Sequence, residues 1–152
     1  MIKINVIVSN TNWKKYIKNP KSYINKKLLL LNKKNKLYKK NILNCSLLLS
    51  ESKEIKKLNK KFRNKNITTD ILSFPFYEKK ILNNLIKKEK KTYLGDIVIN
   101  LSKIKKDNKK STFRNEFNKL WIHGLVHLFG HKHNEDKDYY NMNKIEKKYL
   151  EY

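Results

Sequence analysis

The stretch FRNEFNKLWIHGLVHLFGHKH, residues 113–133, predicts a helix followed by a turn and contains every histidine of the 152-residue chain. Its apolar residues recur at helical spacing and form one stripe, namely Phe113, Phe117, Leu120, Trp121, Leu125 and Leu128. Ser111 or Thr112 is expected to open this helix. Gly130 is expected to end it in the left-handed conformation, because glycine has no Cβ to clash there. The helix and turn therefore present the histidines in a defined arrangement.

The histidine spacing predicts a metal site. His123 and His127 are four residues apart, so on a helix both imidazoles reach one ion. With Gly130 and His133 they reproduce the offsets of the metzincin pattern HExxHxxGxxH. Three histidines leave a fourth zinc position for water, which is typical of catalytic rather than structural sites. We therefore predict one zinc ion held by His123, His127 and His133.

Three neighbouring residues have expected roles around this site. If the helix continued beyond the turn, His131 would replace His133 as a ligand; otherwise it lies near the mouth of the site. Glu116, seven residues before His123, either orients a ligand or is a first-turn carboxylate favourable to the helix dipole. Gly124 stands where metzincin peptidases carry their glutamate base. Its missing side chain is expected to leave room for a group approaching the metal.

The remaining chain predicts a mixture of strands and helices. Apolar runs predict strands over residues 2–6, 42–49, 69–76 and 93–100. Helices are expected over 51–63, where Ile55, Leu58 and Phe62 recur at helical spacing, and over 136–150. Pro20 predicts two helical pieces or a kink within 13–31, and 78–91 is expected to be an exposed loop or a marginal helix. This pattern indicates one α+β domain over residues 1–152, with a four-stranded mixed sheet packed against several helices.

Composition sets limits on location and partners. The net charge of +24 favours a polyanionic partner. Of the 37 lysines and arginines, only Arg63 and Arg114 are arginines. A strongly AT-rich coding sequence produces this bias toward lysine, so compositional drift explains the positive charge equally well. Cys45 is the only cysteine, which favours a buried, reduced thiol. No signal-peptide core and no run of about 18 apolar residues occurs, so we expect a cytoplasmic protein without a membrane span.

Three ordered blocks resemble the YbeY endoribonucleases, a family also described as rRNA maturation factors. HGLVHLFGHKH at 123–133 is similar to the family's HGxLHLxGYDH. LNKKFRNKNITTDILSFPF at 58–76 resembles LNxxYRxxxxxTDVLSFP, and LGDIVIN at 94–100 resembles the LGDI block. Glu116 stands where the family carries a glutamate before its first histidine. The family's Tyr-Asp pair is replaced by His131 and Lys132, which puts a cation where a carboxylate would lie.

The resemblance implies a function and assigns residues to it. His123, His127 and His133 would bind zinc, and Arg63 would contact phosphate near the metal. The implied activity is metal-dependent cleavage of single-stranded RNA in small-subunit rRNA 3′-end maturation and ribosome quality control, with rRNA and the ribosome as partners. A planar guanidinium fork suits phosphate oxygens, which explains an arginine in a lysine-rich chain.

Other interpretations are compatible with the same residues. Arg63 would alternatively form a structural salt bridge to Asp70 or Asp96. A non-catalytic ribosome-assembly factor would use zinc structurally and bind rRNA through its lysines, an interpretation that Lys132 favours. A zinc peptidase or amidase fits the metzincin spacing, but Gly124 argues against it unless a carboxylate such as Glu116 reaches the metal.

Overall fold

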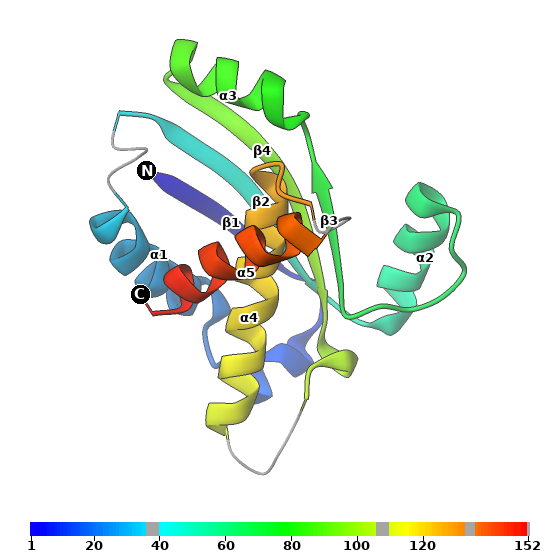
Figure 1. Ribbon diagram of the computed structural model, residues 1–152. Coiled ribbons are helices and arrows are strands. Elements are labelled where there is room, and N and C mark those ends of the chain that lie inside the picture. The colour runs from blue at the N-terminus through cyan, green and yellow to red at the C-terminus, as the bar shows by residue number, and fades with distance from the viewer. Residues whose placement is uncertain (36–39, 106–109, 133–135, 152) are drawn as a thin grey trace.

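The computed structural model describes residues 1–35, 40–105, 110–132 and 136–151 as a single α+β domain (Figure 1). Its strands are β1 (Ile2–Val8), β2 (Ile42–Ser50), β3 (Ile71–Pro75) and β4 (Lys91–Asn100). Its helices are α1 (Pro20–Lys34), α2 (Ser52–Arg63), α3 (Lys79–Lys88), α4 (Lys110–Leu128) and α5 (Asp136–Leu150), with short 3-10 helices η1 (Thr11–Lys15) and η3 (Leu101–Lys103). The predicted fold class is confirmed. No helix in the described ranges is long and apolar enough to cross a membrane.

The four strands form one mixed sheet in the order β1-β2-β4-β3. Strands β1, β2 and β4 run parallel, and β3 pairs antiparallel with β4 at the edge. Every second residue of β2 is buried, as the side-chain alternation of a strand requires: Leu43, Cys45, Leu47 and Leu49. Because β3 is the last strand in this order, one of its edges has no partner strand among the described residues. Residues of β3 line the same pocket as His127 and Gly130, where the histidine helix ends.

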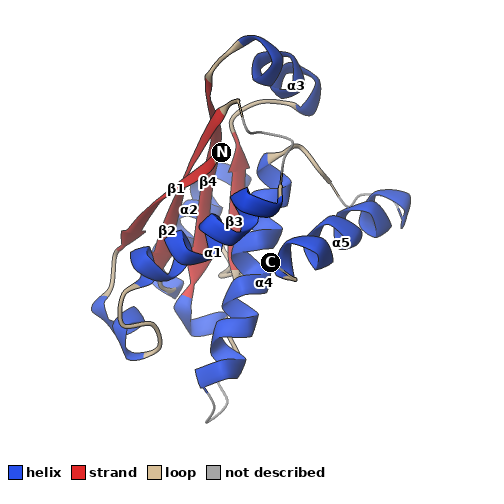
Figure 2. Ribbon diagram, turned by 90° about the vertical axis from the view of Figure 1, so that its left-hand side faces the viewer, coloured by secondary structure: helices blue, strands red, loops and turns tan. Residues whose placement is uncertain are grey.

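Helices cover both faces of the sheet unequally (Figures 1 and 2). Helices α1 and α4 contribute to the large core, whereas Ile55 of α2 packs with Leu72 and Val98 in a small cluster on the opposite face. Phe62, which shares this helical spacing, is 59% exposed. It lies two turns after Ile55, and its ring contacts Phe74 of the edge strand at 5.2 Å between centroids, with Nζ of Lys61 at 5.3 Å from the ring centroid. The sheet therefore covers only the first part of the expected apolar face of α2.

Local sequence signals explain where helices begin and end. Pro20 is the first residue of α1, and the Asn19 side chain accepts a hydrogen bond from the Ser22 backbone N–H at 3.0 Å. The segment around Pro20 therefore forms two helical pieces, η1 and α1, rather than one kinked helix. Residues 79–88 form the helix α3 and bury Leu82. Gly130 has φ +79° and lies two residues beyond α4, which confirms the predicted left-handed turn.

Gly124 faces the sheet rather than the metal site. A Cβ at this position would lie 2.8 Å from Cγ2 of Ile97 and 3.1 Å from Cδ1 of Ile71. Contacts this short are sterically forbidden without movement of the sheet or the helix. The expectation that Gly124 leaves room at the metal is therefore wrong, because this glycine lets α4 approach β3 and β4 closely.

Cys45 is buried in the large core. It is 2% exposed, and burial raises the pKa of its thiol to about 12, with a further contribution from the negative charge of Asp96. A protonated, inaccessible thiol is unreactive, so the expectation of a buried, reduced cysteine agrees with the structure.

Replacing Gly124 with alanine should destabilise the protein. Overpacking against Ile97 costs about 1–3 kcal/mol, whereas alanine in a helix gains at most about 1 kcal/mol over glycine. The mid-range values give an expected net loss of about 1 kcal/mol, or a melting temperature lower by about 2–4 °C. If the clash is the cause, combining Gly124→Ala with Ile97→Ala will cost less than the sum of the two single changes. Equal or higher stability of Gly124→Ala would contradict this packing explanation.

Candidate metal centre

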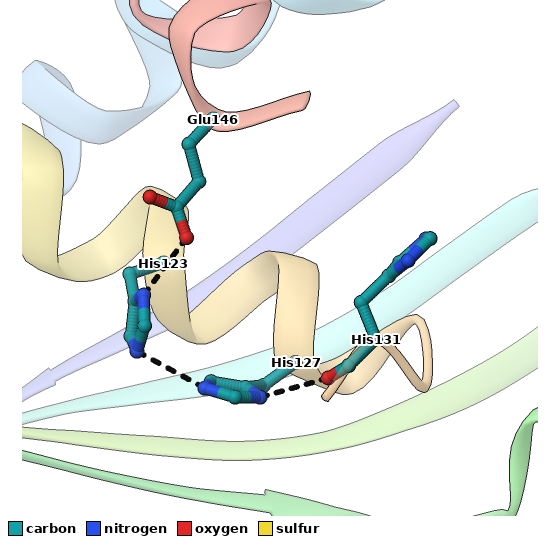
Figure 3. Close-up of polar contacts among 4 residues, drawn as sticks. All are labelled: His123, His127, His131 and Glu146. Atoms are coloured by element: carbon teal, nitrogen blue, oxygen red, sulfur yellow. Dashed lines mark hydrogen bonds and ion pairs between the residues drawn. The ribbon is translucent and has the colours of Figure 1, made fainter. Parts of the chain in front are cut away.

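Two histidines of α4 converge at one point (Figure 3). His123 and His127 lie one turn apart, with ring centroids separated by 4.5 Å and the ring planes nearly perpendicular. Their Nε2 atoms are 3.0 Å apart. The helical spacing thus brings two imidazole nitrogens to one position, as expected for two ligands of one ion.

Each imidazole is oriented through its other ring nitrogen. Nδ1 of His127 lies 2.9 Å from the backbone carbonyl oxygen of His131. A carbonyl oxygen only accepts hydrogen bonds, so Nδ1 of His127 is the donor. Nδ1 of His123 lies 2.8 Å from Oε1 of Glu146 and donates to that carboxylate (Figure 3). Neutral rings that donate through Nδ1 carry a lone pair on Nε2.

The facing Nε2 atoms suit a bound cation. Two lone pairs directed at each other across 3.0 Å repel unless a positive charge, from a metal ion or a shared proton, lies between them. Two nitrogens at about 2.0–2.1 Å from a tetrahedral zinc ion are about 3.3 Å apart, close to the observed separation. A carboxylate and a carbonyl behind the two rings match the usual surroundings of histidine ligands. The described donor set therefore fits zinc.

Of the other two histidines, only His131 lies within the described residues. His133 lies outside the described residues, so the third predicted ligand stays a prediction. Within the described ranges, no group of three or more histidine, cysteine or acidic side chains is placed to hold an ion. The ring of His131 points away from the His123–His127 pair, and α4 does not continue past Gly130 (Figure 3). The helical continuation that would make His131 a ligand is therefore absent.

Arg63 reaches the unpaired edge of β3. Its Nη2 donates to the carbonyl oxygen of Ser73 at 3.2 Å, and its guanidinium carbon lies 5.9 Å from the Phe74 ring centroid. Among the described residues, ion pairs join Glu116 to Lys119 and Glu146 to His123, and Arg63 takes part in neither. The alternative of a salt bridge to Asp70 or Asp96 is thus not observed. Arg63 lines the same pocket as the two converging histidines.

The carboxylate beside the site is Glu146 rather than Glu116. Glu116 binds Lys119 at 2.7 Å on the surface of α4. Glu146 comes from α5 and was missed by the sequence interpretation. Its signal is present, however: with Met142 and Tyr149, both buried, it shares one helical face of α5. An acidic residue within an apolar stripe indicates a buried partner.

A pocket of about 800 Å³ opens beside the two histidines. One wall follows Thr69–Pro75 along β3, together with Arg63. The other wall comes from the start of α3 and from the turn after α4, with Phe76, Tyr77, Glu78, Lys79, Lys80, Gly130, His131 and Lys132. Burial lowers the pKa of His131, the positive charge of Lys79 lowers it further, and Asp138 opposes both. The His123–His127 pair is therefore accessible from this pocket, which several lysine side chains also line.

Comparison with known proteins assigns the chain to a family. The family model described as "Endoribonuclease YbeY" matches residues 7–152. Similar proteins include Endoribonuclease YbeY of Pelagibacter ubique, 47% identical over 96% of this chain and 92% of that protein. Endoribonuclease YbeY of Ehrlichia canis is 34% identical over 99% of this chain and 92% of that protein.

A solved structure has a similar fold. The solution structure of TM1509 from Thermotoga maritima superposes with a TM-score of 0.56 and 25% sequence identity, covering 99% of this chain and 87% of that one. These sequence matches extend over nearly the whole chain, and the range of the family model contains His123 and His127. The chain belongs to the YbeY endoribonuclease family.

Proposed function

We propose that this protein is a zinc-dependent endoribonuclease that cleaves single-stranded RNA in the cytoplasm. Its proposed task is maturation of the 3′ end of small-subunit rRNA and ribosome quality control, in contact with the small ribosomal subunit. Family membership supports an endoribonuclease role. The zinc requirement, the rRNA substrate and the location are our extension.

The convergence of the two Nε2 atoms carries the proposal. Nδ1 of each ring is oriented by a hydrogen-bond acceptor, so both Nε2 lone pairs point toward the same position. A site built only for stability has no need to hold two lone pairs 3.0 Å apart beside an open pocket. His133, as the third ligand, would leave one zinc position for water.

In the proposed site, Arg63 would bind the substrate and Glu146 would orient a zinc ligand. Bound zinc lowers the pKa of a water ligand and polarises a phosphoryl oxygen. Arg63 is held at the pocket wall by the Ser73 carbonyl, which occupies one N–H and leaves the others for phosphate oxygens. Helix α5 supplies Glu146, which accepts the Nδ1 proton of His123 and keeps its Nε2 available.

The peptidase alternative loses its support from this geometry. A side chain at position 124 would point into the sheet, not into the pocket. Glu116, the carboxylate considered as a replacement base, is bound to Lys119. A non-catalytic assembly factor is the remaining alternative, and it differs from the enzyme in binding zinc without cleaving RNA.

Zinc content and RNA cleavage should be lost together on removal of one ligand. The purified protein is expected to contain one zinc ion per chain and to cut single-stranded rRNA fragments. His127→Ala should lower both the zinc content and the cleavage rate, the latter at least about a hundredfold, because one ligand of the proposed centre is removed. His131→Ala is the matched control for zinc content, since its ring points away from the pair. Zinc without cleavage would favour the assembly factor, and absence of zinc would contradict both.

Glu146 should tune zinc affinity through His123. Glu146→Ala removes the hydrogen-bond acceptor and is expected to weaken zinc binding about 10- to 100-fold. Glu146→Gln keeps an acceptor oxygen and should recover part of that loss. Competition with a chromophoric chelator measures the affinity, and Glu116→Gln on α4 serves as the carboxylate control. Equal zinc affinity in Glu146→Ala and the wild type would show that the contact does not position the ligand.

Arg63→Lys should separate substrate binding from metal binding. Lysine keeps the charge but cannot donate to the Ser73 carbonyl and a phosphate through one planar group. We expect unchanged zinc content and a kcat/KM for RNA lower by about tenfold or more. Steady-state cleavage of a fluorescent oligoribonucleotide measures this. Full activity with lysine would show that charge alone suffices at this position.

A further inference from the structure

The end of the pocket formed by the start of α3 differs from the end near Arg63. Phe76 and Tyr77 line it together with Lys79, Lys80 and Lys132, and Glu78 is its acidic residue. Phe76 is 62% exposed, although it is a large apolar side chain. An exposed aromatic ring beside three ammonium groups in one pocket is the combination that single-stranded nucleic acid recognition uses.

The exposed Phe76 ring packs against two neighbouring aromatic rings. It makes edge-to-face contacts with Tyr77 at 4.9 Å and with Tyr93 at 5.7 Å between centroids. Tyr93 is itself anchored, since its hydroxyl donates to Asp96 at 2.6 Å and contacts Ser46 at 2.9 Å. The backbone N–H of Phe76 donates to the Leu94 carbonyl at 2.9 Å. An exposed ring fixed in this way offers a stacking surface at low entropic cost.

Lys79, at the start of α3, lies directly against the turn that follows the histidine helix. A Cβ on Gly130 would lie 2.6 Å from Cβ and 2.9 Å from Cα of Lys79, so the start of α3 touches the turn after α4. Lys79 is thus held beside the turn that follows the histidine helix.

We propose that Phe76 stacks on a base of single-stranded RNA while Lys79, Lys80 and Lys132 bind the adjoining phosphates. This nucleotide subsite lies at the α3 end of the pocket, next to the metal centre. The inference rests on the proposed function, which supplies the RNA, and adds the position and the chemistry of one nucleotide. The pocket volume of about 800 Å³ falls within the range that ligands of nucleotide size occupy.

Equilibrium binding of two oligomers tests the stacking contact. The full-length chain with His127→Ala is used, because cleavage is expected to be lost in this variant. The probes are fluorescent oligoadenylate of 12 nucleotides and an abasic ribose-phosphate oligomer of the same length and charge. Introducing Phe76→Ala should weaken binding of oligoadenylate about 5- to 150-fold, as loss of one stacked base does. Binding of the abasic oligomer should not change.

Three further variants complete the experiment. Phe76→Trp should retain tight oligoadenylate binding, since it keeps a ring. Tyr140→Ala, at an exposed aromatic residue of α5 that does not line this pocket, should bind like the parent. Lys80→Gln should weaken binding of both oligomers and reduce the magnitude of the slope of log affinity against log salt by about 0.7.

Unchanged oligoadenylate binding in Phe76→Ala, or an equal loss for the abasic oligomer, would overturn the proposed subsite. Absence of zinc or of cleavage in the wild type would instead contradict the proposed function and leave the binding result to be judged by itself.

Discussion

The close contact between α4 and the sheet at Gly124 determines where everything else at the site lies. The glycine has Ile97 and Ile71 directly against its backbone, so the helix axis cannot be further from β3 and β4 without opening the core. On a helix, the residues one before and three after this position lie about 100° and about 60° from it, both displaced to the same side, so they flank the surface that contacts the sheet. His123 and His127 are those residues, and both line the pocket along β3. A packing requirement in the core thus sets the depth of the histidine pair in the pocket.

Three separate segments then act on the end of this helix. Helix α5 contributes Glu146 to His123, and the turn after α4 contributes the His131 carbonyl to His127. The start of α3 presses on Gly130, where a left-handed φ of +79° lets the chain reverse and a side chain would collide with Lys79. Each ring is thereby held by a contact from outside its own helical turn. Orientation of this kind is what allows two imidazoles to face the same point.

Periodicity and turn chemistry predicted most of the fold, because they depend on neighbours in the sequence. The four strands, the break at Pro20 and the turn at Gly130 all followed from local patterns. The errors lie where a residue's partner is distant in the sequence. Phe62 has the spacing of a buried residue but extends past the sheet, and Gly124 lies beside two histidines yet serves the core. Glu146 was missed because its partner is 23 residues away on another helix. Spacing along one helix shows which residues share a face, but not what that face meets.

The same distinction bears on the net charge of +24. Summed charge raises association rates with any polyanion and does not depend on where the lysines lie. Charges within about 8–10 Å of a bound phosphate act on it directly, because screening is weak over that distance. Lys79 and Lys80 line the pocket, whereas Lys87 and Lys88 at the other end of α3 do not. Compositional drift accounts equally for all four lysines, but only the first pair lines the pocket that His123 and His127 also line. Position in the fold, rather than the number of lysines, therefore separates charges with a specific role from those that only add to the general field.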